Sequence, residues 1–98
     1  MTAFFVSRIE VKDTDKLQAY AAATGPTIGA HGGSLVLRGK SEKTLVGTEA
    51  GTHMTSVVQF PDMKALDDWF GSAEYQQHAE LRDEAGDMQF VVYQAPEA

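Results

Sequence analysis

The two ends of the chain carry stretches whose apolar side chains fall on both faces of a predicted strand. Residues 3–11 read AFFVSRIEV and residues 88–94 read MQFVVYQ, and both are rich in the aromatic and β-branched residues that favour strands. Successive strand residues point to opposite faces. Apolar groups therefore occupy both faces: Phe4 and Val6 against Phe5, Ile9 and Val11, then Val91 and Tyr93 against Phe90 and Val92. A sheet with one wet face alternates apolar and polar residues cleanly, so this sheet needs cover on both faces.

Helical spacing predicts a helix after residues 13–15, whose Asp-Thr-Asp side chains suit a helix start. The helix is expected to end at His31-Gly32-Gly33, because glycine takes a left-handed cap without strain. Gly25-Pro26 interrupts the pattern, since proline lacks an N–H and clashes with the preceding turn. The sequence therefore predicts either a kink there or a restart with Pro26 at the first helical position.

The sequence after the double glycine predicts strands at 34–39 and 54–60. A helix capped by Asp62 is expected next, with an apolar stripe that includes Trp69 and Phe70. Gly71 breaks this helix, and Ser72 is placed to cap a second piece that runs to about Glu84. Residues 45–48 either continue the hairpin or belong to a bulged loop, and residues 49–53 predict a turn.

The resulting order is β-α-β-β-α-β, in one domain spanning residues 1–98. Such an order gives an α+β fold with an antiparallel four-stranded sheet and its helices on one face, the ferredoxin-like architecture. The helices can shelter only one face of the sheet.

The size of the uncovered face predicts association. Four strands about 17 Å long and about 4.8 Å apart present roughly 350 Å². At ~25 cal/mol per Å², leaving this area wet forfeits up to about 9 kcal/mol per protomer. Two such faces closing on each other can outweigh an association cost of roughly 4–15 kcal/mol. We therefore expect a homodimer joined sheet to sheet about a two-fold axis.

Composition narrows the classes of partner. The 98 residues have a net charge of -6 with only 8 Lys and Arg, which argues against nucleic acid and anionic membranes as partners, because both need a basic patch. No apolar run approaches the ~20 residues of a membrane span, and the first residues lack the pattern of a signal peptide. With no cysteine, disulfides and thiolate metal sites are excluded. We expect a cytoplasmic protein.

With its elements placed, the chain resembles the small bacterial proteins of domain-of-unknown-function family thirteen-thirty, within the dimeric α+β barrel superfamily. The matching features are Asp13 and Tyr20, AHGG (30–33), LVLRG (35–39), QFPDMKALDDWFGSAEYQ (59–76), Arg82 and GDMQFVVY (86–93). One departure lies at residues 46–55, where the family usually has a shorter turn.

The resemblance implies a ferredoxin-like protomer whose sheet pairs with that of a second copy. It supplies no reaction. Distant relatives on the same barrel include cofactor-free monooxygenases, a lactone isomerase and haem-degrading enzymes, and transferring any of these activities rests on fold analogy.

Trp69 and Tyr75 flank the Gly-Ser break, and aromatic residues at this spacing are typical of a core. The alternative is a ligand wall, because the break leaves backbone N–H groups near Ser72 at a helix start, where an anion or a carbonyl oxygen can bind.

His31 is interpreted either as a helix-end residue favoured by the helix dipole or as an acid/base at the edge of a pocket. Arg38 is either a substrate-carboxylate ligand or part of an ion pair at a rim or dimer interface. The histidines lack metal-ligand spacing, so no metal site and no cofactor are expected.

These residues lead to two hypotheses. The first is a homodimer that binds a small organic molecule between sheet and helices, with Tyr20, Arg38, Trp69, Ser72 and Tyr75 contacting it and His31 transferring protons. A cofactor-free oxygenase or isomerase fits this set. The alternative is a non-catalytic binding or assembly module whose aromatics all belong to the core.

Overall fold

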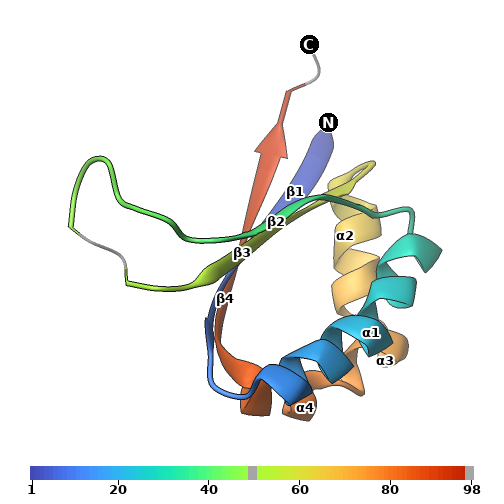
Figure 1. Ribbon diagram of the computed structural model, residues 1–98. Coiled ribbons are helices and arrows are strands. Elements are labelled where there is room, and N and C mark those ends of the chain that lie inside the picture. Colours follow the sequence, from blue (N-terminus) through green and yellow to red (C-terminus); the bar gives the residue numbers. More distant parts are fainter. Residues whose placement is uncertain (49–50, 97–98) are drawn as a thin grey trace.

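A four-stranded sheet with all its helices on one side forms the protein (Figure 1). The computed structural model describes residues 1–48 and 51–96. The elements are β1 (Thr2–Val11), α1 (Thr14–Ala30), β2 (Ser34–Lys40), β3 (Met54–Phe60), α2 (Met63–Phe70), α3 (Ala73–Gln76), α4 (Ala79–Ala85) and β4 (Gly86–Ala95). The strand order is β2-β3-β1-β4, and each neighbouring pair is antiparallel. The predicted ferredoxin-like α+β fold is confirmed.

The strand register assigns each side chain to a face of the sheet. Phe5 of β1 lies opposite Val58 of β3 and Val92 of β4, so these three side chains share the helix-covered face. Alternate residues of β1 are buried on that face, beginning at Ala3. The core combines buried side chains of this sheet face with side chains from α1, α2 and α3. Its buried members are Ala3, Phe5, Tyr20, Val58, Phe60, Leu66, Trp69 and Tyr75.

Helix α1 begins and ends as the sequence predicts. The Asp13 side chain accepts a hydrogen bond from the Lys16 backbone N–H at 3.0 Å. At the other end, Gly32 has φ of +81°, and the Gly33 N–H reaches the Ile28 carbonyl at 2.9 Å. This pattern is a Schellman motif, in which glycine takes the left-handed position.

Proline 26 lies inside α1, which runs unbroken from Thr14 to Ala30. Of the two predicted alternatives at Gly25-Pro26, the restart is therefore wrong, and a kink within the continuous helix stays a prediction. Proline removes the N–H that would bond the carbonyl of Ala22, and Ala22 is exposed, so water can satisfy that carbonyl instead. The loss of this one backbone hydrogen bond is small enough for the helix to continue.

The predicted caps of the second helical region are confirmed. Asp62 accepts from the Ala65 N–H at 2.8 Å, and Ser72 Oγ accepts from the Tyr75 N–H at 3.2 Å. The piece after Ser72 is two helices rather than one, because α3 ends at Gln76 and α4 starts at Ala79. The His78 N–H bonds to the Tyr75 carbonyl three residues back, a tight turn that stops the α-helical ladder.

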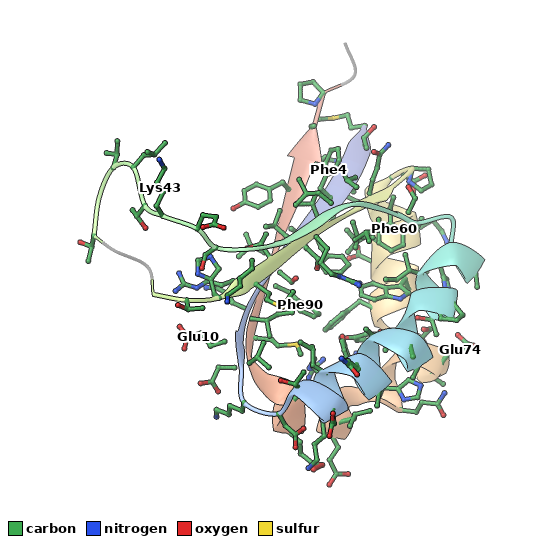
Figure 2. The ribbon with its side chains drawn as sticks, viewed as in Figure 1. Phe4, Glu10, Lys43, Phe60, Glu74 and Phe90 are labelled. Atoms are coloured by element: carbon green, nitrogen blue, oxygen red, sulfur yellow. The ribbon has the colours of Figure 1, made fainter. Side chains whose placement is uncertain are left out.

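A long arm joins β2 to β3 and extends away from the helices (Figure 1). Residues 45–48 form no strand, so the loop interpretation of this stretch is correct. Hydrogen bonds between Ser41 and His53 close the base of the arm, and Figure 2 shows Lys43 on it, far from the helical layer. Residues 49 and 50 of the predicted turn lie outside the described residues.

The other face of the sheet carries apolar side chains that no described helix covers. The register assigns to this open face Phe4, Val6, Leu37, Val57, Val91 and Tyr93. Leu37, Val91 and Tyr93 are exposed. The sequence-based prediction of a second, uncovered apolar face is thus confirmed for the described chain.

Candidate functional site

A cavity of about 480 Å³ separates α1 from the sheet. Its floor is apolar and comes from the helix-covered face of the central strands, with Phe5 from β1, Val58 from β3 and Phe90 from β4. Figure 2 shows Phe90 on the side of the sheet that faces α1. Helix α1 packs against α4 and α3 more than against the strands, and this arrangement leaves room beneath it.

The mouth of the cavity lies between α1 and β2. The exposed residues of its lining all come from these two elements or their edges; they are Thr14, Gln18, Gly25, Gly29, Ser34, Leu35 and Arg38. Lining residues on β1 and β3, by contrast, are buried or half-buried. A ligand would therefore enter from the β2 side and extend toward the middle of the sheet.

One row of side chains across the sheet is polar. Arg38 of β2 lies opposite Ser56 of β3, and Ser56 lies opposite Ser7 of β1. All three line the cavity. Cross-strand partners point to the same face, so the row runs from the mouth toward the buried floor.

The two serines form a hydrogen-bonded pair. Their hydroxyl groups bond to each other, and Ser7 Oγ accepts from the Ser56 backbone N–H at 3.2 Å. Ser7 is fully buried. Sequence reasoning missed both serines as site residues, although a serine between Phe5 and Ile9 interrupts an otherwise apolar face of β1.

Arg38 is exposed at the mouth. Among residues 1–48 and 51–96, its guanidinium has no ion-pair partner. Within one protomer, the interpretation as a rim ion pair therefore finds no support. The charge remains available to an anionic group that enters the cavity.

Tyr20 lines the cavity, and its hydroxyl belongs to a buried polar chain. The Tyr20 and Tyr75 hydroxyls lie 2.7 Å apart, and Arg82 Nη1 donates to the Tyr75 hydroxyl at 3.2 Å. Burial, followed by the hydrogen bond to Tyr75, raises the pKa of Tyr20 far above its ordinary value. Tyr20 therefore stays neutral at physiological pH and cannot act there as a base.

Arg82 stays charged beside this pair. Burial works to lower the pKa of Arg82, but hydrogen bonds to Tyr75 and Asp83 outweigh it and raise that pKa overall. The guanidinium therefore supplies a permanent donor to Tyr75.

Trp69 connects the core to the cavity. Its ring stacks on Phe5 with centroids 5.1 Å apart and lies 4.4 Å from the ring of Tyr75. Its indole Nε1–H donates to Thr27 Oγ at 3.0 Å. Trp69 is 2% exposed and Tyr75 is fully buried, which agrees with the core interpretation, yet part of Trp69 also lines the cavity wall.

Ser72, Tyr75 and His31 lie outside the described lining. The Ser72 hydroxyl donates to the Trp69 carbonyl at 2.7 Å and caps α3. His31 ends α1, with Nδ1 2.9 Å from the Thr27 carbonyl. This contact requires a proton on Nδ1 and leaves Nε2 as the second ring nitrogen. The roles assigned to these three residues stay predictions.

Within the described part of the chain, no group of three or more His, Asp or Glu side chains is arranged to hold a metal ion. Its helices are also too short or too polar to cross a membrane.

A ferredoxin-like α+β fold with a cavity between α1 and the sheet defines the structural class of this protein. Residues 2–96 match the family model described as Domain of unknown function (DUF1330). The chain therefore belongs to this family, as the resemblance suggested. No curated protein sequence matches it.

Solved structures share the fold at low sequence identity. A protein of unknown function from Rhodopseudomonas palustris has 16% identity and a TM-score of 0.78, covering 99% of this chain and 84% of that one. SnoaB, a cofactor-independent oxygenase from Streptomyces nogalater, has 13% identity and a TM-score of 0.71, covering 99% and 95%. A dimeric ferredoxin-like protein of unknown function from Jannaschia sp. CCS1 has 11% identity and a TM-score of 0.72, covering 97% and 100%.

Proposed function

We propose that this protein is a homodimer that binds one small organic molecule in the cavity of each protomer. The observation that carries the proposal is the apolar cavity of about 480 Å³ between α1 and the sheet. Ligand pockets are usually about 300–1,000 Å³ in volume and mostly apolar, with a few polar groups that fix orientation. The combination of apolar walls with one row of polar side chains fits this description.

The site residues take two kinds of role. Tyr20 and Trp69 contribute aromatic surface to the ligand, and Arg38 binds an anionic group on it. Ser72 and Tyr75 position these aromatic residues instead of contacting the ligand. Ser72 donates a hydrogen bond to the Trp69 carbonyl, and the Tyr75 hydroxyl bonds the Tyr20 hydroxyl.

The uncovered apolar face of the sheet supports the proposed homodimer. Within residues 1–48 and 51–96, no helix covers its apolar side chains on β1, β3 and β4, and a second sheet would bury them. The Jannaschia protein with the same fold is dimeric. The cavity lies on the opposite side of the sheet and remains accessible in such a dimer.

A cofactor-free oxygenase or isomerase is the first candidate activity, and the fold shared with the Streptomyces oxygenase supports it. His31 remains the predicted proton-transfer residue. A cytoplasmic location also remains a prediction.

One observation favours the alternative of a non-catalytic binding module. The titratable side chains in the described lining are Tyr20 and Arg38. General bases in enzymes are usually histidine or carboxylate, and the described lining contains neither. A binding protein needs no such group.

Calorimetric titration with 2-naphthol, an uncharged aromatic probe, tests the pocket. Ala21 lines the cavity, whereas Ala22 is the next residue on the same helix, is exposed and does not line it. We expect the wild type and Ala22→Phe to bind 2-naphthol, and Ala21→Phe to lose binding because the added ring fills the cavity. Absence of binding to the folded wild type, or equal binding by Ala21→Phe, would refute the pocket.

A further inference from the structure

Ser56 and Ser7 between them have one hydroxyl hydrogen without a well-placed protein acceptor. If Ser7 donates to Ser56 Oγ, the Ser56 hydrogen has no acceptor among the bonds of the described chain. If Ser56 donates instead, the Ser7 hydrogen has only the Ser56 carbonyl, at 3.5 Å. That distance is long for an O–H donor, which prefers about 2.7–2.8 Å. The first arrangement leaves a donor at Ser56 that is free to point into the cavity.

Arg38 lies on the strand next to this donor. Arg38 and Ser56 are cross-strand partners, and directly opposed residues in antiparallel strands have Cα atoms about 4.5–5.5 Å apart. Arg38 has no ion pair in the described chain. Guanidinium groups bind carboxylates through parallel hydrogen bonds. Because Arg38 and Ser56 both line the cavity, a ligand whose carboxylate binds Arg38 can present a second oxygen to the Ser56 hydroxyl.

The inner end of the cavity has aromatic walls. Phe5, Phe90 and Trp69 lie deeper along its floor and wall, and Phe5 lies 5.1 Å from each of the other two rings, centroid to centroid. Aromatic rings of this kind favour an apolar or aromatic body. The ligand thus has a polar end at the β2 edge and an apolar end toward β4.

We infer that the pocket selects a carboxylic acid with an oxygen on the carbon next to the carboxylate and an apolar, aromatic body. Arg38 pairs with the carboxylate, Ser56 donates to the adjacent oxygen, and Ser7 orients the Ser56 hydroxyl. A 2-oxo acid and a 2-hydroxy acid share this chemistry. The inference rests on the proposed function, because it assigns a ligand class to the same cavity.

Three matched probes separate the two polar contacts. Phenylpyruvate has both the carboxylate and the adjacent carbonyl, 3-phenylpropanoate has only the carboxylate, and 1-phenylpropan-2-one has only the carbonyl. We expect phenylpyruvate to bind the wild type at least about tenfold more tightly than either of the others in calorimetric titration, a ratio equivalent to about 1.4 kcal/mol.

Variants assign each preference to its residue. Ser56→Ala should weaken phenylpyruvate binding about tenfold and leave 3-phenylpropanoate unchanged, since only the first ligand has an oxygen for the hydroxyl. Arg38→Gln should weaken both acids and leave the ketone unchanged. Lys40→Gln is the matched control, because it removes the same charge from β2 but does not line the cavity.

The outcomes distinguish the two proposals. If 2-naphthol binds but phenylpyruvate and 3-phenylpropanoate bind equally, the ligand class is wrong and the pocket stands. If Ser56→Ala weakens both acids equally, the assigned contact is wrong. If none of the probes binds the folded wild type, both proposals fail. The comparison of ligands on the wild type needs no variant to fold.

Discussion

The hydroxyl groups of Tyr20 and Tyr75 lie 2.7 Å apart between α1 and α3. This contact joins residues 55 positions apart in the sequence, and Arg82 of α4 completes the chain by donating to Tyr75. A polar network thus ties α1, which lines the cavity, to α3 and α4 behind it. Such networks are stabilising when every member has its partners.

Removing the Tyr20 hydroxyl should destabilise the protein without unfolding it. Tyr20→Phe leaves the Tyr75 hydroxyl with Arg82 as its remaining partner, and we expect a loss of about 1–2 kcal/mol in the free energy of unfolding. Tyr75→Phe should cost more, because both Tyr20 and Arg82 lose a partner. Urea unfolding at pH 7 measures both. Losses below about 0.5 kcal/mol for both variants would show that the network adds little.

The same network gives a pH dependence with a defined sign. Burial and the Tyr75 hydrogen bond raise the pKa of Tyr20 in the folded state, whereas an unfolded tyrosine ionises near pH 10. Above about pH 10 the unfolded chain has lost a proton that the folded chain keeps. The free energy of unfolding therefore falls as the pH rises, by up to about 1.4 kcal/mol per pH unit from this group.

Urea unfolding between pH 8 and 11 should show a shallower fall for Tyr20→Phe than for the wild type. All other titrating groups are common to the two proteins, so the difference in slope reports Tyr20. Parallel curves would contradict the raised pKa.

The indole of Trp69 depends on Thr27 for its hydrogen bond. Thr27→Val keeps the branched shape but removes the acceptor, and we expect a cost of about 1–3 kcal/mol because a buried donor loses its partner. Thr27→Ser keeps the hydroxyl and should recover most of that stability. The protein has one tryptophan, so its fluorescence follows unfolding directly. Equal losses for valine and serine would assign the effect to packing instead.

Gly86 leaves no room for a side chain. A Cβ at this position would lie 2.4 Å from the Glu10 carbonyl oxygen, whereas one at Gly29 would meet nothing within 4 Å. We expect Gly86→Ala to destabilise by about 1–3 kcal/mol, as overpacking does. Gly29→Ala, inside α1, should stabilise by about 0.5–1 kcal/mol. Thermal unfolding of the two variants, measured side by side, checks the opposite signs.

Two neighbouring valines of β4 test the dimer. Val91 lies on the open face and Val92 on the helix-covered face, and their exposed fractions in one protomer are similar, 38% and 42%. Val91→Lys should give a folded monomer in size-exclusion chromatography with light scattering, because it introduces a charge into the sheet-to-sheet interface. Val92→Lys should remain a dimer. A monomeric wild type at micromolar concentration would refute the assembly.

Sequence patterns predicted the elements because their causes are local. Asp13, Asp62 and Ser72 each bond an N–H three residues away, and such caps can be read from short stretches. The continuous helix through Pro26 could not be predicted from the proline alone, since its outcome depends on whether the freed carbonyl faces water. The split at His78 likewise depends on how α3 and α4 pack.

The candidate site was predictable in part. Tyr20, Arg38, Trp69 and Tyr75 were identified as pocket walls, and all of these except Tyr75 line the cavity. Ser7 and Ser56 were not, because their pairing joins positions 49 apart and depends on the register between β1 and β3. Single-sequence patterns carry no information about that register. The position of His31 outside the lining similarly follows from the geometry at the end of α1.

Because alternate residues of each strand point to opposite sides, Phe5, Ser7 and Ile9 of β1 line the cavity while Phe4 and Val6 belong to the open face. In the proposed dimer, the two ligand chambers therefore lie on the outer flanks, with both sheets between them. Molecules can enter or leave without separating the subunits. Substitutions at neighbouring positions of the same strand can therefore change ligand binding or subunit association, each with little effect on the other.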